Sequence, residues 1–327
     1  MAITVALAGD TMLGRGVSER LLSKGPRSVF APEVPDIIAS ADVCVVNLEC
    51  CISDAGEPWP APGKRFFFRA PPVAAETLAW LGVDCVTLAN NHALDFGRQA
   101  LLDTRLRLSS AGIASVGAGE TAAEARAPVV KDADGSRLVV VGLTDHPADY
   151  AAGSDRPGVA YADLSEGVPS WLTAELGGLR SAAGADVVLV TPHWGPNMMP
   201  EPRPYVRAAA RSLVAAGATF VAGHSAHVFH GVEGAVAYDL GDLVDDYRVD
   251  PYVRNDLGIL VLVTLDHDGP RRMRVVPLRL DFCFTSLASA EEYAWVARRF
   301  VAACASVGSE LAVRDEGDQL VVDWPER

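Results

Sequence analysis

Six short apolar runs, each followed directly by polar or metal-binding residues, constrain the fold of this chain more than any other feature. The residues that follow these runs are Gly9-Asp10, Asn47-Leu48-Glu49, Asn90-Asn91-His92, His193-Trp194-Gly195, Gly223-His224-Ser225-Ala226-His227 and Asp239-Leu240-Gly241-Asp242. Short runs that are rich in β-branched residues predict buried strands. In an open α/β sheet, ligands bind outside the carboxyl ends of the strands. The six polar segments are therefore expected to converge on one crevice.

Amphipathic helical stretches separate most of these runs, and this alternation predicts an α/β fold. Strands are expected at residues 4–8, 42–46, 84–88, 137–143, 186–191, 219–222, 235–238, 259–265 and 274–280. Helices are expected at about residues 72–81, 98–111, 170–183, 204–216 and 290–306. The first five strands suit a mostly parallel layer, and the closely spaced strands from about residue 235 onward suit an antiparallel layer. Two sheets that share one core are the expected architecture.

The size of the chain fits one large core, since 50% of its 327 residues are hydrophobic. We predict a single domain over residues 1–327, because neither an internal repeat nor a low-complexity linker interrupts the pattern. Residues 281–327 are expected to add a C-terminal helix and strand that pack on the sandwich. A homodimer formed through this tail is a second option. The stretch 56–72 is rich in proline and aromatic residues and predicts a long ordered loop at the rim of the site.

The net charge of -14 limits the partners that the chain can bind. An acidic surface repels nucleic acid and anionic membranes, so neither is an expected partner. An anionic substrate would need a local positive centre, which a bound metal ion supplies. The sequence shows no signal-peptide pattern, no apolar run long enough to span a membrane and no CxxC pair among its six cysteines. These features predict a cytoplasmic protein with reduced thiols and no membrane anchor.

The polar segments combine carboxylates, an amide oxygen and imidazoles. Each has a simpler explanation alone, because Gly-Asp is common in turns and a lone histidine is often a core residue. Five of the seven histidines nevertheless lie in or beside these segments: His92, His193, His224, His227 and His230. The mixture suits two divalent ions such as Mn, Fe or Zn, and it suits neither calcium nor a structural zinc. The sequence therefore predicts a dinuclear metal site.

At these residues the chain resembles the CapA family, often labelled poly-γ-glutamate capsule biosynthesis proteins. That family is similar in fold to the calcineurin-like metallophosphoesterases. The resemblance spans about residues 3 to 256 and rests on residues 9–15, 47–49, 89–97, 193–195, 223–227 and 238–242. It implies a two-layer mixed β-sandwich flanked by helices, in an αββα order, with a dinuclear site at one end.

The resemblance also implies roles for individual residues. Asp10 would bind the first ion and Glu49 would bridge the two ions. Four further ligands would complete the site, namely Asn91, His193, His224 and His227.

The catalytic residues implied by the resemblance lie beside these ligands. His92 would act as general acid or charge stabiliser, with Asp95 to orient it. Arg15 would clamp an anionic group of the substrate. Further substrate contacts are expected from Asn90, His230 and Asp242.

The chain also departs from these patterns. Metallophosphoesterases place a histidine two residues after the first aspartate, where this chain has Met12, and they space their last two histidines more tightly than His224 and His227. Many CapA-like proteins read Gly-x-His-Pro-His and Ser-Leu-Gly-Asn-Phe, where this chain has Ser225-Ala226 and Asp239-Leu240-Gly241-Asp242. One ion is therefore expected to bind more weakly, and which histidine binds which ion stays open.

Three functions are compatible with these residues. The first is hydrolysis of a phosphoester on a small anionic substrate by water that two metal ions activate. The second is hydrolysis or formation of a γ-glutamyl or other amide bond in a peptide-like substrate, because the same ions polarise a carbonyl oxygen. The third is a non-catalytic role in capsule assembly with a degraded metal site.

Overall fold

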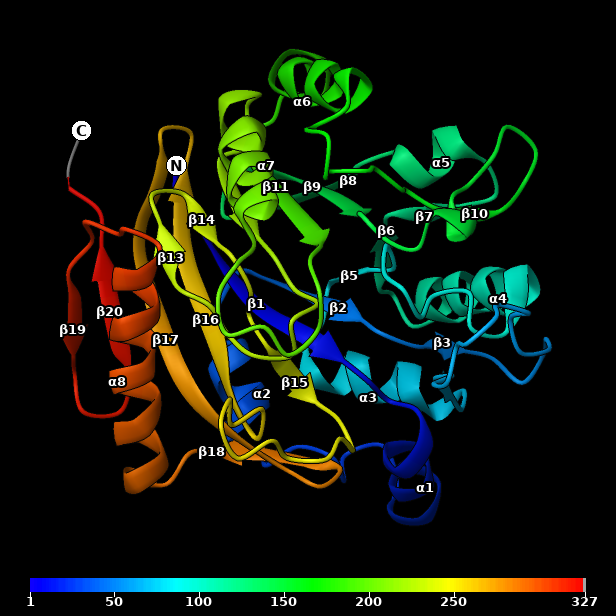
Figure 1. Ribbon diagram of the computed structural model, residues 1–327, viewed down its shortest axis with the longest axis horizontal. Helices are drawn as coiled ribbons and strands as arrows, with labels where there is room; N and C mark the ends of the chain where they lie inside the picture. The colour runs from blue at the N-terminus through cyan, green and yellow to red at the C-terminus, as the bar shows by residue number, and fades with distance from the viewer. Residues whose placement is uncertain (326–327) are drawn as a thin grey trace.

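Two mixed β-sheets, packed face to face, form the centre of the protein in a computed structural model that describes residues 1–325 (Figure 1). The larger sheet has the order β19 (Val313–Asp315), β20 (Leu320–Asp323), β17 (Gly269–Asp281), β16 (Leu257–Asp266), β1 (Ile3–Thr11), β2 (Val43–Leu48), β5 (Cys85–Thr87) and β6 (Ala114–Val116), with β15 (Asp242–Val244) beside β1 and β18 (Phe284–Leu287) beside β17. The smaller sheet has the order β13 (Val232–Glu233), β14 (Val236–Ala237), β12 (Phe220–Ala222), β11 (Val187–His193), β9 (Ser136–Thr144) and β8 (Val129–Ala133). Two short pairs lie outside these sheets, β3 (Cys51–Ile52) with β4 (Arg69–Ala70) and β7 (Ala118–Gly119) with β10 (Gly158–Val159).

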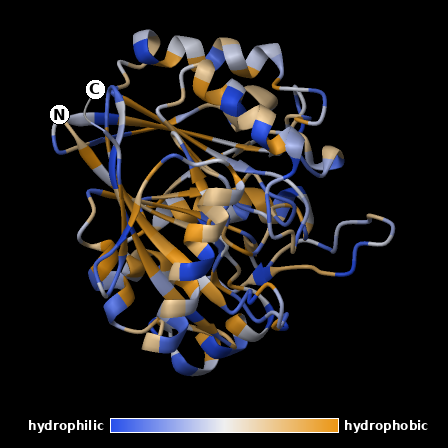
Figure 2. Ribbon diagram, turned by 60° about the vertical axis from the view of Figure 1, so that its left-hand side comes forward, coloured by the Kyte–Doolittle hydropathy of each residue, from blue (hydrophilic) through white to orange (hydrophobic). Residues whose placement is uncertain are grey.

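Alternating side chains of the same strands supply two different cores. In β1, Ile3, Val5 and Leu7 face the smaller sheet, whereas Ala6 and Ala8 pack against the helices on the outer side. Burial on both faces explains why these strands read as nearly continuous apolar runs. Figure 2 shows the same feature, with strands that are mostly hydrophobic and helices that carry both kinds of residue.

Helices cover both outer faces of the sandwich. The larger sheet is covered by α1 (Arg15–Lys24), α2 (Glu33–Ile38), α3 (Val73–Leu81) and α4 (Gly97–Ser110), and the smaller by α6 (Ser170–Ala182) and α7 (Pro204–Ala215). Two short elements, α5 (Ala122–Arg126) and the 3₁₀ helix Ala148–Tyr150, lie in connections. Helix α8 (Ala290–Ser306) adds Val296 and Phe300 to the core between the sheets. The predicted αββα order is confirmed.

The strands are distributed between the two layers differently from the expectation of one parallel and one antiparallel layer. Strands β1, β2, β5 and β6 are parallel in the larger sheet, and β9, β11 and β12 are parallel in the smaller one. The antiparallel hairpin β16–β17 extends the larger sheet, because β16 pairs with β1 along Ile3–Leu7. In the smaller sheet, β8 pairs antiparallel with β9, so both sheets are mixed.

Two expectations from composition have structural counterparts. All six cysteines are buried and free. Among residues 1–325, no helix is long and apolar enough to cross a lipid bilayer.

Candidate metal centre

The polar segments that follow the six strands meet at one end of the sandwich, as the sequence predicts. Asp10 lies near the end of β1, and Glu49 directly follows β2. Strand β11 ends at His193, which forms an isolated β-bridge with His224, just after β12. Asp242 starts β15, which lies in register with Asp10. The sandwich thus brings residues from both sheets to one place.

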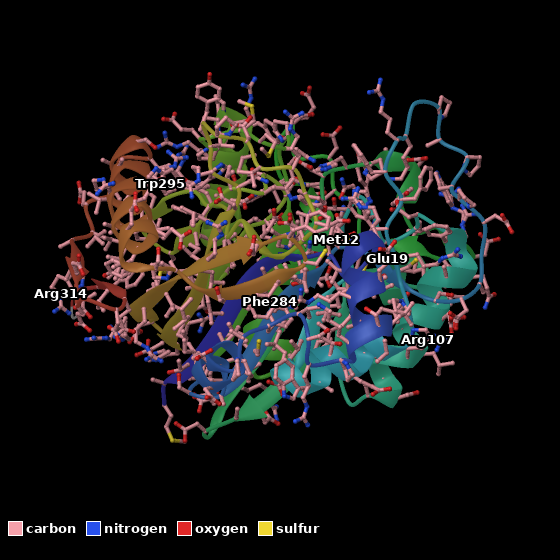
Figure 3. All side chains as sticks on the ribbon, turned by 90° about the horizontal axis from the view of Figure 1, so that it is seen from below. Met12, Glu19, Arg107, Phe284, Trp295 and Arg314 are labelled. Carbon is pink, nitrogen blue, oxygen red and sulfur yellow. The ribbon has the colours of Figure 1, made fainter. Side chains whose placement is uncertain are left out.

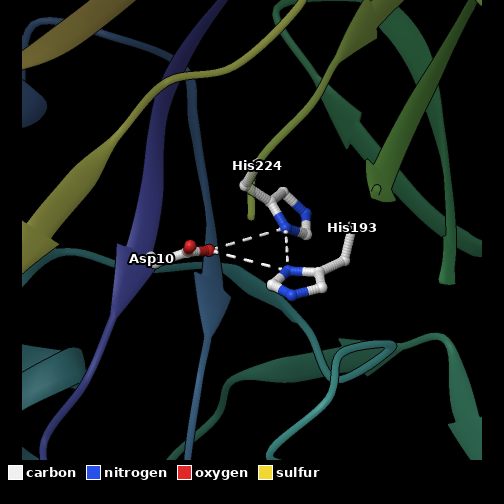
Figure 4. A group of neighbouring side chains, drawn as sticks. All are labelled: Asp10, His193 and His224. Atoms are coloured by element: carbon white, nitrogen blue, oxygen red, sulfur yellow. Dashed lines mark hydrogen bonds and ion pairs between the residues drawn. The ribbon is translucent and has the colours of Figure 1, made fainter. Parts of the chain in front are cut away.

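One group of possible ligands contains Asp10, His193 and His224 (Figure 4). The Nδ1 atoms of the two histidines are 2.8 Å apart. Asp10 Oδ1 lies 3.6 Å from Nδ1 of His224 and 3.8 Å from Nδ1 of His193. All three side chains are buried, so two ring nitrogens and one carboxylate oxygen face one another away from solvent.

A second group contains Asp10, His227 and Asp242. His227 Nδ1 lies 3.3 Å from Asp10 Oδ2 and 2.8 Å from Asp242 Oδ1. Asp10 therefore belongs to both groups, with one oxygen toward each. Glu49 belongs to neither group of three, although its Oε1 lies 4.0 Å from His193 Nε2. The bridging role expected of Glu49 stays a prediction.

Buried polar atoms without a hydrogen-bond partner within residues 1–325 are concentrated around these two groups. They include Asp10 Oδ2, Glu49 Oε1, Asn91 Oδ1, His193 Nε2, His224 Nε2 and Asp242 Oδ2. Such atoms are rare in folded proteins, because an unpaired buried polar group costs about 1–3 kcal/mol. Carboxylate, amide and imidazole atoms are the donors that divalent transition metals use. The donor set therefore fits divalent cations at this place.

Burial and mutual charges shift the pKa values of these groups. Burial and the nearby charge of Asp10 raise the pKa of Glu49 well above its ordinary value. Burial and His224 lower the pKa of His193 well below its ordinary value, so this ring is neutral at pH 7. Burial would raise the pKa of Asp10, but the neighbouring His227 ring lowers it overall. Neutral imidazole is the form that binds a metal, and a bound cation would favour the ionised form of the Glu49 carboxyl group.

The asparagines of two segments hold Asp10 in place. Asn47 Nδ2 donates to Asp10 Oδ1 at 2.6 Å, and Asn90 Nδ2 donates to Asn47 Oδ1 at 2.9 Å and to the Leu48 carbonyl at 2.8 Å. The Asn90 side-chain oxygen accepts from the backbone N–H of His92. This amide is fully buried and makes its hydrogen bonds within the protein, and its expected contact with substrate stays a prediction. Asn90 supports Asp10 and His92.

The predicted pair of His92 and Asp95 is present. His92 Nδ1 lies 2.6 Å from Asp95 Oδ2, and its ring stacks on Phe68 with centroids 3.9 Å apart. The other oxygen of Asp95 accepts from Tyr150 Oη at 3.1 Å and pairs with Lys64 Nζ at 2.8 Å. Burial lowers the pKa of His92 despite the opposing effect of Asp95. These contacts fix the ring and leave its Nε2 atom for other partners.

A cleft of about 430 Å³ opens beside the metal centre. His92 and His227 line its inner end, and Arg15, Arg248, Phe66 and Tyr247 line the remainder. Phe66 and its neighbours belong to the loop 56–72, which therefore lies at the rim, as the sequence predicts. This loop is held by Trp59, whose Nε1 donates to Asp149 at 2.7 Å.

Two other residues expected to bind substrate occupy different positions. Arg15 lines the cleft, but its guanidinium is paired with Asp246 and lies 4.8 Å from the centroid of the Phe68 ring. His230 is buried away from the cleft, with Nε2 bonded to the Met199 carbonyl at 2.8 Å. His230 does not line this cleft, and its expected contact with substrate stays a prediction.

Sequence reasoning missed two residues near the centre, His146 and Asn197. The His146 ring lies 5.2 Å from that of His193, and its Nδ1 bonds to Asp145. Asn197 Nδ2 lies 3.0 Å from His227 Nε2. His146 follows the end of a buried strand as the other histidines do, so its position could have been predicted. Asn197 lies in a loop whose course no local pattern predicts. On the other side of the centre, Tyr247 Oη donates to Glu49 at 3.1 Å.

Comparisons with known proteins show which proteins this chain is similar to. A family described as "Bacterial capsule synthesis protein PGA_cap" matches residues 4–247. A probable polyglutamine synthesis accessory protein of Mycobacterium tuberculosis is 30% identical over 90% of this chain and 89% of its own length. The PGA biosynthesis protein CapA of Bacillus subtilis is 27% identical over 84% of this chain and 71% of its own length. Among solved structures, a putative 5'-nucleotidase from Staphylococcus aureus aligns with a TM-score of 0.48 and 12% identity, covering 91% of this chain and 58% of that one.

Proposed function

The chain belongs to the PGA_cap family of CapA-type capsule synthesis proteins, and we propose that it is a metal-dependent hydrolase that cleaves a phosphoester of a small anionic substrate. The observation that carries this proposal is the concentration of unpartnered buried ligand atoms around Asp10, at the inner end of a cleft. A purely structural role would not favour so many buried, unpaired polar atoms in one place. A site that binds cations accounts for them.

The ligands divide between two positions that share Asp10. Asp10, His193 and His224 would hold one ion, and Asp10 and His227 contribute to the other. Glu49 and Asn91 carry further buried oxygens without partners and complete the set. When bound, divalent ions would lower the pKa of a water from 15.7 toward about 7 and offset charge that develops on the substrate.

The remaining residues position the substrate and move a proton. Arg15 and Arg248 line the cleft, and because Arg15 is paired with Asp246, Arg248 supplies the positive charge that an anionic substrate needs in a protein of net charge -14. Since Asp95 engages Nδ1 of His92, the Nε2 atom is the one that exchanges a proton with the substrate. Phe66 and Tyr247 restrict water at the same wall.

Amide chemistry is the second candidate function. The relatives carry names that refer to polyglutamine or PGA synthesis, so a γ-glutamyl bond is the alternative substrate at the same site. A site that stabilises charge on a phosphoryl oxygen also polarises a carbonyl oxygen. A non-catalytic assembly role is the third candidate, and Met12 is the departure that favours it.

One substrate screen separates the candidates. The protein, reconstituted with Mn²⁺ or Zn²⁺, would be given p-nitrophenyl phosphate, bis-p-nitrophenyl phosphate and γ-glutamyl-p-nitroanilide. We expect turnover of a phosphoester that is lost in His193→Ala and retained in His267→Ala, a change at an exposed histidine. Release of p-nitroaniline alone would replace the proposal with amide hydrolysis. Metal uptake without turnover of any substrate would favour the assembly role.

A further inference from the structure

Met12 cannot provide the ligand that a histidine at its position would supply. Its side chain is fully buried in the core, next to the start of α1 (Figure 3). Its sulfur accepts a hydrogen bond from the Gly14 backbone N–H at 3.0 Å. A thioether is also a soft ligand, which is a poor match for Mn²⁺. The ion shared by Asp10 and His227 therefore needs another ligand.

Asp242 lies where that ligand is needed. Strand β15 runs parallel to β1 with Asp242 in register with Asp10, and Asp10 N–H donates to the Gly241 carbonyl at 2.9 Å. Asp242 Oδ1 is 2.8 Å from His227 Nδ1, and Oδ2 is buried without a hydrogen-bond partner in the part of the chain that the structure describes. The ligand atoms of Asp10, His227 and Asp242 all lie within 4.8 Å of one another.

We propose that Asp242 is a direct ligand of the ion held by Asp10 and His227, and that it makes this position selective for an oxygen-preferring cation such as Mn²⁺. The inference rests on the proposed metal centre and not on the reaction it catalyses. This position combines two carboxylates with one imidazole, whereas the other combines one carboxylate with His193 and His224. Oxygen ligands favour Mn²⁺, and imidazoles favour Zn²⁺ or Fe²⁺. The two positions are thus chemically different.

The competing explanation is that Asp242 only orients His227 through a hydrogen bond. In Asp242→Asn the side-chain oxygen still accepts from His227 Nδ1, but the ligand charge is lost. If Asp242 only orients His227, Mn²⁺ binding should survive this change. If Asp242 is a direct ligand, Mn²⁺ binding should weaken. Asp281→Asn, at an exposed carboxylate, is the matched control.

The test measures metal binding without any assay of activity. Wild type, Asp242→Asn and Asp281→Asn are loaded with one equivalent of Zn²⁺, and Mn²⁺ is then titrated while free Mn²⁺ is followed by electron paramagnetic resonance. We expect Asp242→Asn to weaken Mn²⁺ binding by more than about 100-fold, beyond the 10–100-fold that loss of a group that only orients a ligand typically costs. The amount of zinc bound to Asp242→Asn is expected to stay at the wild-type level. The Mn²⁺ affinity of Asp281→Asn is expected to do the same. Retained zinc shows that the variant is folded.

Other outcomes overturn the proposal. Wild-type Mn²⁺ affinity in Asp242→Asn would leave Asp242 an orienting residue, while the metal centre and the proposed function would stand. If wild type bound no metal, both would fall. Should the variant fail to fold, X-ray absorption at the zinc edge of the wild-type Zn/Mn protein decides, since two imidazoles on zinc agree with the proposal and one contradicts it.

Discussion

At the scale of single residues, Asp10 is the point at which both ligand groups meet. One of its oxygens faces His193 and His224, and the other faces His227. Asn47, itself held by Asn90, fixes the carboxylate through Oδ1. Through these hydrogen bonds the two asparagines determine where the shared ligand lies. Mutation of residues that support ligands in this way typically lowers metal affinity or activity by about 10–100-fold.

His92 is predicted to act on the substrate and not on the metal. In His92→Ala, kcat is expected to fall by about 10²–10⁴-fold because proton transfer is lost. Metal content should stay at the wild-type level, since His92 belongs to neither ligand group. Steady-state kinetics and elemental analysis of the same preparation check this, with His267→Ala as control. Unchanged kcat, or loss of metal, would show that His92 has a different role.

His230 predicts a specific dependence of stability on pH. Burial and Arg299 lower the pKa of His230 to about 4, despite the hydrogen bond to Met199. The unfolded chain takes up this proton below about pH 6.5 and the folded protein does not, so acidification from pH 6.5 to 4 favours unfolding. The lowered pKa corresponds to about 3 kcal/mol, at about 1.4 kcal/mol for each pKa unit.

Urea unfolding of metal-free protein at pH 7 and at pH 4.5 measures this contribution. His230→Gln should lose less stability than wild type between the two pH values, because its side chain does not ionise. The exposed His267→Gln should behave as wild type. Equal losses in His230→Gln and wild type would mean that His230 is already protonated, or exposed, in the folded state.

At the scale of elements, the approach of β1 to the segment before β15 is what places Asp10 beside Asp242. Gly9 makes this approach possible, because a Cβ at this position would lie 1.9 Å from the Gly241 carbonyl oxygen. That neighbour is backbone and cannot turn aside. The glycine before the first aspartate is therefore required by packing between strands, and a turn explanation for Gly9-Asp10 is unnecessary.

Gly9→Ala is expected to lower the free energy of unfolding by about 1–3 kcal/mol, as overpacking does in other cores. Gly178→Ala in α6 is the matched control, since no atom lies within 4 Å of its added Cβ. Helix propensity predicts that this control gains up to about 1 kcal/mol. Urea denaturation of both variants checks the pair, and a Gly9→Ala protein as stable as wild type would contradict the close approach.

The sequence predicts most elements because the buried strands carry β-branched runs and the long helices carry clear periodicity. It does not predict α1 or the pairing of β16 with β1. The first follows a strand too closely to be recognised as separate, and the second depends on contacts between residues about 250 positions apart. The positions of the strand ends in the sequence predict that four residues are neighbours, namely Asp10, Glu49, His193 and His227. Asn197 reaches the centre from a loop, so only the folded chain shows its position.

At the scale of the whole molecule, the metal centre is a cluster of buried acidic side chains inside a protein that is itself acidic. Asp239, Asp242 and Asp245 are buried near Asp10, and burial raises the pKa of each of the three. Buried charges are destabilising unless they are paired. Divalent cations at this place would therefore stabilise the fold as well as support chemistry.

Removing metal with a chelator is expected to lower the melting temperature. A ligand present at one hundred times its Kd stabilises a protein by about 2.7 kcal/mol, which corresponds to a shift of roughly 4 °C for a chain of this size. Added Mn²⁺ or Zn²⁺ should restore the wild-type value but leave Asp10→Asn unchanged. Equal responses of the two proteins would place the stabilising ions elsewhere on the surface.

Elemental analysis of purified wild type and His193→Ala, after reconstitution and removal of free metal, tests the central claim most directly. The account predicts about two divalent ions per chain in wild type, as in dinuclear hydrolases, and a lower content in His193→Ala. Absence of stoichiometric metal from both proteins would contradict the metal centre and the hydrolase proposal with it.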